Sequence, residues 1–248
     1  EEDSVSLERR LEMKRETDYV LDIAVIAFPY ISNFDDFDPL GRETGVRLRY
    51  VEANDALGEP DLIILPGTKR TVAGLEYLMR KGLGEEVAAR AKAGTPIIGI
   101  CGGYQMLGER ILDPEHVESK HSEVQGLGLL PVTTVFSSDK STCQVRGQVM
   151  CGDGILKSAE GISFKGYEIH MGQTSSGENA PFVIEERSRK DCQDYEGCMS
   201  VEGNILGTYI HGLFHNEELR RAMLTELADR KGVELPQFRQ FRSREEEL

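Results

Sequence analysis

The sequence predicts an α/β fold, a doubly wound, mixed and mainly parallel sheet. The first observation is a set of short, continuous apolar runs, which are typical of parallel strands covered on both faces. The second is a segment with helical spacing of apolar residues between two of these runs. The third is a change of character in the second half of the chain, where short β-like runs are punctuated by glycine and predict antiparallel additions.

The first half supplies the expected strands and helices in alternation. Strands are expected within the segments Tyr19–Phe28, Val46–Ala53, Asp61–Gly67 and Thr95–Ile100. Residues 71–94 have helical spacing and end at a glycine, and a second helical pattern starts at Cys101 and continues to about Leu112. The last expected helix lies between Asn216, a plausible N-cap, and Gly232, a typical C-terminal stop.

The chain divides into three parts by composition. Residues 1–18 are almost all polar or charged and are expected to form a linker or solvated arm. Residues 19–235 carry the apolar patterns and are expected to form one domain, and residues 236–248 form a charged tail.

Charge and cysteine content exclude several functions. The 248 residues have a formal net charge of −14, which argues against binding to nucleic acid or an anionic membrane. The five cysteines are odd in number and none has C-x-x-C spacing, so neither a disulfide framework nor a metal site is expected. No apolar run approaches the ~20 residues of a membrane span. A reducing cytoplasmic location is the natural expectation.

Cys101 lies where a predicted strand ends and a helix begins. Ligands of open α/β sheets bind at the carboxyl ends of the strands. The sequence Gly-Ile-Cys-Gly-Gly, residues 99–103, is similar to a nucleophile elbow with cysteine in place of serine. The flanking glycines permit a sharp turn, and the backbone N–H groups that follow can lower the thiol pKa and hold an oxyanion. We therefore expect Cys101 to be a catalytic nucleophile.

A thiolate nucleophile needs a base, and His211 is the best-placed histidine. It lies at the end of the apolar run "NILGTYI" and before the last helix. His116 and His121 lie in a polar loop and are expected to be solvated. A base from a second strand end could meet Cys101 at the same edge of the sheet, so His211 is the expected general base.

Four motifs in order resemble a known family. The segments "GICGGYQMLG", "DLIILPGTK", "KGYEIHMG" and "GTYIHGLFHN" together resemble the class I, triad-type glutamine amidotransferase domain of cobyric acid synthases, which has a flavodoxin-like sheet. The resemblance covers residues 21–231. It implies that Cys101 attacks the glutamine amide and that His211 is the base. It further implies an oxyanion hole made by the backbone N–H groups of Gly67 and Gly102, and substrate contact by Gln105.

One departure from the family pattern concerns the group that orients the base. Typical class I enzymes have His-x-Glu, whereas residue 213 of this chain is leucine. Glu217 and Glu218 are close in sequence, but a helix N-terminus explains two acidic residues equally well. A group from another part of a longer protein is a further alternative. This gap predicts that the chain alone is a weak glutaminase.

The motif "GYEIHMG" has two interpretations. Glu168 and His170 share one face of a predicted strand, and Tyr167 precedes them. The three side chains could form the solvated face of a strand, or a wall of the glutamine pocket or of the ammonia exit. The residues do not decide between these alternatives.

The resemblance also implies partners outside the chain. No G-x-x-x-x-G-K-[ST] motif is present, so the chain should supply ammonia but not activate its acceptor, and no cofactor is expected in it. An ATP-dependent synthetase domain preceding residue 1 would use ATP and Mg²⁺ to amidate carboxylates of a corrin in cobalamin biosynthesis. Two alternatives remain at this point: a regulatory scaffold that hydrolyses nothing, and a glutaminase for another acceptor such as a cell-wall precursor ligase.

Overall fold

The computed structural model describes residues 19–52, 54–175 and 179–237. The arm expected at residues 1–18 and most of the tail expected from residue 236 onward lie outside the described residues.

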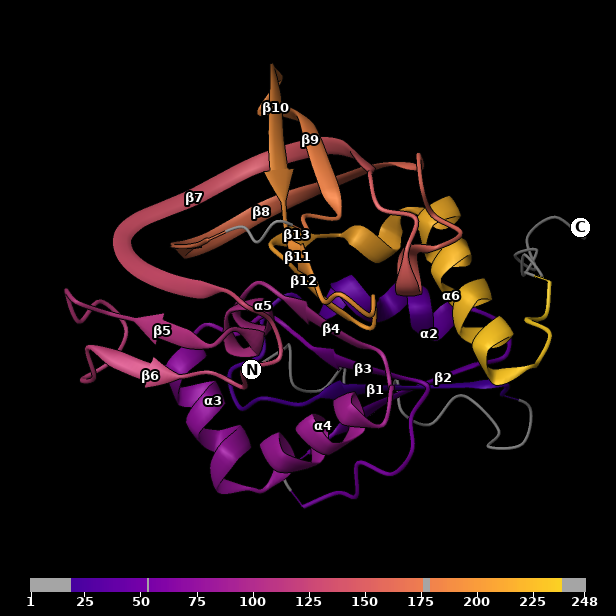
Figure 1. Cartoon of the computed structure of the whole chain (residues 1–248), viewed down its shortest axis with the longest axis horizontal. Coiled ribbons are helices and arrows are strands. Elements are labelled where there is room, and N and C mark those ends of the chain that lie inside the picture. Colours follow the sequence, from indigo (N-terminus) through magenta and orange to yellow (C-terminus); the bar gives the residue numbers. More distant parts are fainter. Residues whose placement is uncertain (1–18, 53, 176–178, 238–248) are drawn as a thin grey trace, which may run out of the picture.

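A six-stranded sheet forms the centre of the described chain (Figure 1). Its strand order is β11-β12-β4-β3-β1-β2, and all neighbours pair in parallel except β11 with β12. β1, β3, β4 and β12 are buried along their whole length, as expected for continuous apolar strands. The predicted doubly wound, mainly parallel sheet is therefore confirmed. The strands are β1 (Leu21–Ile26), β2 (Val46–Val51), β3 (Leu62–Leu65), β4 (Ile97–Ile100), β11 (Cys198–Met199) and β12 (Ile205–Thr208).

Helices cover both faces of this sheet. In Figure 1, α3 and α4 lie below the sheet, and α2 and α6 lie above it. The helices are α2 (Asp38–Arg42), α3 (Thr71–Arg80), α4 (Leu83–Lys92), α5 (Gly102–Leu107) and α6 (Glu217–Lys231). The single helix predicted over residues 71–94 is wrong in one respect, because Gly82 adopts a left-handed conformation with φ 77° and divides it into α3 and α4. As predicted, α6 ends at Gly232, which is also left-handed.

The second half of the chain forms a sheet of its own. The order β10-β9-β7-β5-β6 is extended by β8, which pairs with both β7 and β13. The expected antiparallel additions are thus present: β11 extends the first sheet, and the other strands build a second, seven-stranded sheet. Its strands are β5 (Arg110–Leu112), β6 (Glu123–Gln125), β7 (Thr133–Val149), β8 (Ser163–Thr174), β9 (Phe182–Arg187), β10 (Lys190–Glu196) and β13 (Ile210–His211).

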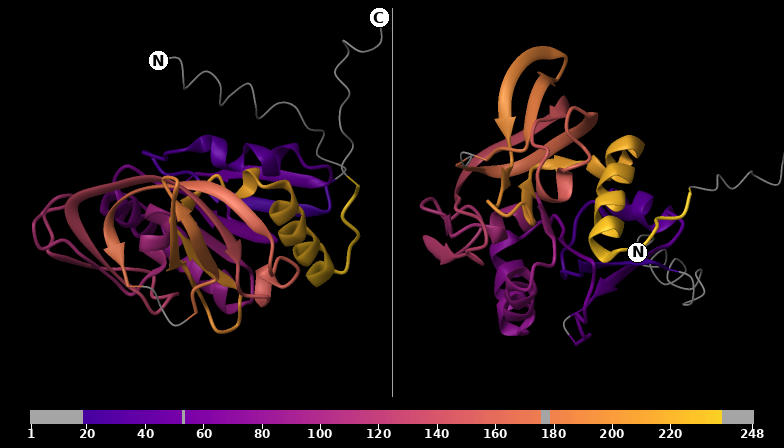
Figure 2. Two further views of the ribbon diagram at one scale, coloured as in Figure 1. Left: turned by 90° about the horizontal axis from the view of Figure 1, so that it is seen from above. Right: turned by 45° about the vertical axis from the view of Figure 1, so that its right-hand side comes forward.

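Two local expectations in this region are wrong. The helical pattern from Cys101 to Leu112 stops at Leu107, because Gly108 is extended and β5 follows. The β-like runs of the second half are not all short, because β7 is one long strand, which passes through a register shift against β8 between Val135 and Lys140. In the right-hand view of Figure 2, as in Figure 1, strands β7–β10 of the second sheet lie above the first sheet.

Candidate active site

The carboxyl ends of four neighbouring strands lie side by side at one edge of the first sheet. β12, β4, β3 and β1 are adjacent in the sheet and run in the same direction. Cys101 follows β4, Gly67 follows β3, and His211 lies three residues beyond the end of β12. A turn of 3₁₀ helix, η1 (Phe34–Phe37), follows β1 and brings Asp36 to the same place. The predicted meeting of Cys101 and His211 at this edge agrees with the arrangement of the strands.

Cys101 occupies the sharp corner that its sequence predicts. Its backbone has φ 53° and ψ −111°, a region that residues with a side chain rarely adopt, and strain of this kind is typical of functional sites. The corner packs so closely on β3 that a Cβ atom at Gly103 would collide with the carbonyl of Leu65. The Cys101 backbone N–H donates to Thr208 at 2.8 Å, and its thiol lies 3.4 Å from the carbonyl oxygen of Ile169 on β8.

Gly67 lies against both Cys101 and His211. A Cβ atom placed on it would be 3.2 Å from His211 Cε1 and 3.7 Å from Cys101 Cβ. A Cβ atom on Gly102 would be 3.2 Å from the backbone nitrogen of Thr68. The two backbone segments expected to form the oxyanion hole therefore lie side by side at the nucleophile, and both need glycine for space.

Asp36 holds the imidazole of His211. Asp36 Oδ2 lies 2.7 Å from His211 Nδ1, and Asp36 Oδ1 accepts the backbone N–H of Gly212 at 2.8 Å. Both side chains are almost completely buried. Because Nδ1 donates to the carboxylate, Nε2 is the free nitrogen of the ring. Nε2 is buried and makes no hydrogen bond with any described residue, so it is available for a proton from the thiol of Cys101.

The orienting group that sequence reasoning missed is therefore Asp36. Glu217 and Glu218 lie in the first turn of α6 and make neither a hydrogen bond nor an ion pair with His211 within the described structure. The signal that could have found Asp36 is the acidic segment "NFDDF" directly after the first strand. The rule that ligands gather at the carboxyl ends of strands places this segment at the same edge of the sheet, but it does not say which residue the segment contacts there.

The turn that carries Asp36 is itself fixed to the segment that carries His211. The ring of Phe37 packs against that of Phe214, with centroids 6.3 Å apart. His215 Nε2 lies 2.9 Å from the backbone oxygen of Asp35. These contacts hold the Asp36 carboxylate in place across the gap between β1 and the segment that precedes α6.

Electrostatics favour a protonated imidazole. Burial by itself would lower the pKa of His211, but the hydrogen bond and charge of Asp36, together with the neighbouring Cys101, outweigh burial and raise the pKa to about 9. The arrangement therefore suits a cysteine nucleophile with a histidine that accepts and returns its proton.

The three residues singled out in "GYEIHMG" divide between two faces of β8. Tyr167 stacks on the ring of His211 with centroids 5.1 Å apart, and its hydroxyl lies 2.7 Å from Asn33 Nδ2. Tyr167 thus covers one face of the imidazole. Glu168 and His170 share the opposite face, as their spacing predicts, and line a pocket there.

Gln105 is buried, and its side-chain amide hydrogen-bonds to other groups of the protein. Nε2 donates to the Met171 carbonyl at 3.0 Å and lies 3.1 Å from the Tyr209 hydroxyl, while Oε1 accepts from Thr71 at 2.9 Å. The side chain therefore ties α5 to β8 and to the segment of His211. Its expected contact with glutamine stays a prediction, for which the side chain would have to exchange one of these bonds.

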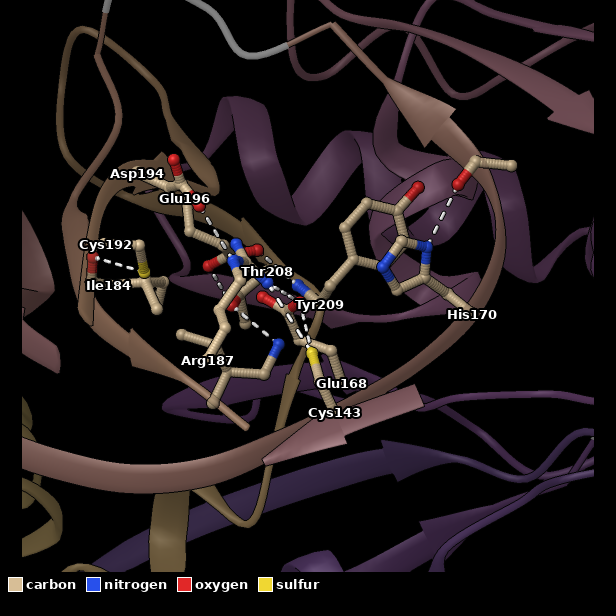
Figure 3. A network of polar contacts seen from close by, with 12 residues as sticks. Cys143, Glu168, His170, Ile184, Arg187, Cys192, Asp194, Glu196, Thr208 and Tyr209 are labelled. Atoms are coloured by element: carbon tan, nitrogen blue, oxygen red, sulfur yellow. Dashed lines mark hydrogen bonds and ion pairs between the residues drawn. The ribbon is translucent and has the colours of Figure 1, made fainter. Parts of the chain in front are cut away.

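Glu196 fixes the crossing between the two sheets that delivers His211. The chain leaves the first sheet at Thr208 and enters the second at Ile210. The buried Glu196 carboxylate accepts Thr208 Oγ1 at 2.7 Å and the backbone N–H of Tyr209 at 2.6 Å (Figure 3). Thr208 Oγ1 accepts the N–H of Ile210 at 3.0 Å, so this one carboxylate organises the whole crossing.

Replacing Asp36 with asparagine should change how stability depends on pH. The pKa of His211 in the folded chain, about 9, is above its ordinary value of 6.5. The interaction therefore stabilises the fold fully below pH 6.5, and this stabilisation is lost as the pH rises through 9. Wild type should exceed Asp36→Asn by roughly 1–3 kcal/mol in free energy of unfolding at pH 6 and by much less at pH 9.5. Urea unfolding at both pH values measures the difference. The exposed neighbour Asp35, changed to asparagine, is the matched control, and an identical pH dependence in both variants would contradict the assignment.

Solved structures that superimpose on this chain identify its fold. A PurLQS structure from Thermotoga maritima superimposes with a TM-score of 0.61 and 22% sequence identity, covering 84% of this chain and 99% of that one. A structure described as a glutamine amidotransferase superimposes with a TM-score of 0.55 and covers 84% of this chain. The fold is that of the glutamine amidotransferases. More specifically, residues 22–219 match the CobB/CobQ-like glutamine amidotransferase domain, and the chain belongs to that family.

Relatives with higher sequence identity are longer proteins. The cobyric acid synthase of Alkaliphilus metalliredigens is 47% identical over 251 residues, which span 100% of this chain and 49% of that protein. The cobyric acid synthase of Moorella thermoacetica is 48% identical over 234 residues, 94% of this chain and 45% of that protein. The chain thus spans about half the length of the curated relatives it matches. No helix in the described ranges is long and apolar enough to cross a membrane.

Proposed function

We propose that the chain hydrolyses the side-chain amide of glutamine and supplies the ammonia to a longer cobyric acid synthase. The observation that carries this proposal is the arrangement of Cys101, His211 and Asp36. The thiol lies at a strained corner, Nε2 of the imidazole is free, and Nδ1 is held by a buried carboxylate. Family membership supports glutamine as the substrate.

The chemistry follows from these three groups. His211 Nε2 takes the thiol proton, and the Cys101 thiolate adds to the amide carbon of glutamine. The backbone N–H groups at Gly67 and Gly102 receive the negative charge that develops on the amide oxygen. His211 returns its proton to the leaving nitrogen, so ammonia departs and a glutamyl thioester remains. Water, activated by the same imidazole, hydrolyses the thioester to glutamate and the free thiol. Asp36 keeps Nδ1 protonated throughout and does not itself need to change its protonation state.

The proposed whole protein contains more than this chain. The matched cobyric acid synthases are about twice as long, which supports a synthetase region preceding the segment that corresponds to this chain. That region would use ATP and Mg²⁺ to activate carboxylates of a corrin, and the ammonia made here would amidate them. Identities of 47–48% to cobyric acid synthases favour this acceptor over a cell-wall precursor. The scaffold alternative loses its main argument, because Asp36 occupies the place of the missing orienting residue.

We expect the isolated chain to hydrolyse glutamine without ATP and to form no amide product. The reason is that all three members of the proposed triad come from this chain, so the weakness predicted from Leu213 no longer has its physical cause. Release of ammonia and glutamate from glutamine measures the activity, and a glutamine-analogue electrophile should modify one residue, Cys101, with one label per chain. Absence of both hydrolysis and labelling would favour the scaffold.

The second arm of this experiment adds the synthetase region of the same protein with ATP and corrin acceptor. Amide formation with glutamine as the nitrogen source, lost when the label blocks Cys101 and regained with added ammonia, supports the proposed partnership. Hydrolysis by the chain without amide formation in the mixture would leave the glutaminase and overturn the acceptor.

A further inference from the structure

Helix α3 begins beside the proposed oxyanion hole without a side-chain cap of its own. Arg70 occupies its N-cap position and makes no capping hydrogen bond, and the first turn of the helix contains no acidic residue. A guanidinium is unfavourable there, because the N-terminus of a helix carries positive partial charge and backbone N–H groups without partners in the helix. The start of α3 therefore needs an acceptor with negative charge from elsewhere in the chain.

Glu118 supplies that acceptor from the loop between β5 and β6. Its Oε1 accepts the backbone N–H of Val72 at 2.8 Å, although the two residues are 46 positions apart. Val72 is the second residue of α3, so its N–H is one of those that the helix itself leaves unpaired. The carboxylate thus does from a distant loop what an N-cap side chain usually does from within the same segment.

The loop is built so that Glu118 is presented to α3. The buried carboxylate of Asp113 accepts the backbone N–H groups of Val117, Glu118 and Ser119 at 2.8, 3.0 and 2.7 Å. The backbone N–H of Asp113 in turn donates to Ser122 at 2.8 Å and closes the loop. Because its own backbone is fixed in this way, Glu118 can hold the start of α3 in a defined place.

The first turn of α3 packs directly on the corner that carries the nucleophile. A Cβ atom on Gly102 would lie 3.1 Å from Thr71 Oγ1 and 3.2 Å from the backbone nitrogen of Thr68. Thr71 Oγ1 also donates to Gln105 Oε1 on α5 at 2.9 Å. Gly67 lies just before these two threonines in the chain. A shift at the start of α3 would therefore move the Gly67 side of the proposed oxyanion hole against its Gly102 side.

Glu118 is anchored on the same side of the hole as Gly102. Strand β5 follows α5 closely in the chain, and the residues after β6 return to that helix, where Leu127 N–H donates to the carbonyl of Met106 at 2.8 Å. The contact between Glu118 and Val72 thus closes a ring of elements: α5, β5, the loop, and α3. A closed ring of this kind fixes the spacing of the two backbone segments that the hole requires.

The charge of Glu118 is kept at a cost in stability. Burial and the charge of Asp113 raise the pKa of Glu118 to about 7, against the opposing effects of the α3 backbone amides and of Arg70. A further contact between loop and helix joins His121 to Glu76 at 3.9 Å. Since the pKa in the folded chain exceeds the ordinary value of 4.5, ionised Glu118 destabilises the fold progressively as the pH rises from 4.5 through 7. Groups whose pKa is shifted in this direction by burial are typical of functional positions.

We propose that Glu118 is a positioning residue for the oxyanion hole: by accepting the N–H of Val72 it fixes the start of α3, and with it Gly67, against the corner at Gly102. Glu118 touches neither glutamine nor the reacting atoms. This inference rests on the proposed function, because the hole itself belongs to that proposal. It follows that Glu118 should affect the charged transition state more than the binding of glutamine.

The experiment measures kcat and KM for glutamine hydrolysis at pH 8 in wild type, Glu118→Ala and Glu118→Gln. Glu118→Ala removes the acceptor and should lower kcat about 10- to 100-fold with KM changed less than about twofold, because small displacements of catalytic groups act mainly on the transition state. Glu118→Gln keeps a neutral acceptor and should lower kcat about fivefold, the difference between a charged and a neutral hydrogen bond. Glu115→Gln is the matched control, since it removes an exposed carboxylate from the same loop and should leave kcat unchanged.

Stability measured on the same variants separates positioning from a merely structural role. Because ionised Glu118 destabilises the fold, Glu118→Gln should be at least as stable as wild type in urea at pH 8, and its stability relative to wild type should be lower at pH 5 than at pH 8. A lower kcat in a variant that is no less stable supports the proposal. A kcat that falls only together with stability overturns it. If Glu118→Ala shows no cooperative thermal transition, Glu118→Gln alone decides the comparison.

A last measurement is independent of turnover. The backbone amide signal of Val72, followed by ¹⁵N NMR, should titrate with a midpoint near pH 7 in wild type and not in Glu118→Gln, and an equal titration in both overturns the contact. Full kcat in both Glu118 variants, in a chain whose wild type hydrolyses glutamine, overturns the positioning role and leaves the proposed function standing. A wild type that titrates at Val72 but does not hydrolyse glutamine overturns the proposed function, and the positioning role with it.

Discussion

Replacing Cys101 with alanine is expected to lower kcat for glutamine hydrolysis by about 10⁶-fold, the order of the loss found when the nucleophile of a catalytic triad is removed. No other described group can form the thioester at this edge of the sheet, so the covalent route disappears. The thiol does not stabilise the strained backbone of Cys101, which has φ 53°. Backbone contacts hold this corner, such as the hydrogen bond from the Cys101 N–H to the carbonyl oxygen of Thr208. The variant should therefore fold normally.

Ammonia release under single-turnover conditions measures this loss, and circular dichroism and the thermal midpoint check the fold. Cys151→Ala is the matched control, because Cys151 is a half-buried thiol outside the site and should not matter for turnover. Full activity in the Cys101 variant, with or without an effect of Cys151, would contradict the assignment. A variant that loses activity only because it unfolds would be identified by its lost thermal transition.

Cys101 and His211 could be predicted because each carries a local signal. The corner at Cys101 is encoded within five residues, from Gly99 to Gly103, and His211 follows an apolar strand directly. Their meeting then follows from a general property of parallel sheets, in which carboxyl ends of neighbouring strands lie at one edge. The fold class follows in the same way from continuous apolar runs and helical spacing.

Asp36 could not be predicted with the same means. It lies 175 residues before His211, and its contact depends on β1 and β12 belonging to the same sheet with β3 and β4 between them. A single sequence with no strand order does not contain that information locally. The second sheet was missed for a related reason, since a strand pattern specifies which face is apolar but not which sheet a strand joins.

The face of β8 that carries Glu168 could be predicted only in part. A strand period of two correctly predicts that Glu168 and His170 share a face. Whether that face meets solvent or a pocket depends on Arg187, which arrives from β9, and on Tyr209, which arrives with the segment of His211. The two interpretations of "GYEIHMG" could therefore be separated only once the neighbouring strands were in place.

Replacing His211 with alanine is expected to lower kcat for glutamine hydrolysis by about 10²- to 10⁴-fold, the usual contribution of a positioned acid–base group. The variant loses the acceptor of the thiol proton and the donor for the leaving nitrogen. Asp36→Asn should lose less, because the imidazole remains but no longer has a carboxylate to fix its Nδ1 proton and its orientation. His170→Ala is the matched control, because it also removes an imidazole near the site. His170 lies on the other face of β8, and its ring hydrogen-bonds to the backbone oxygen of Gly172 on the same strand.

The order of these losses separates a base from a merely structural residue. We expect His211→Ala to be most impaired, Asp36→Asn intermediate and His170→Ala least, each compared at several pH values and with similar KM for glutamine. Asp36 and Cys101 raise the pKa of His211 to about 9. Removing the Asp36 carboxylate should therefore lower the pKa of His211. The rate of Cys101 alkylation, measured against pH, should show the His211 transition at a lower pH in Asp36→Asn than in wild type. A structural role for Asp36 would lower activity at every pH by the same factor and leave that pH unchanged. A greater loss in His170→Ala than in His211→Ala would reverse the assignment of the base, because His170 would then have to reach the leaving nitrogen from the opposite face of the strand.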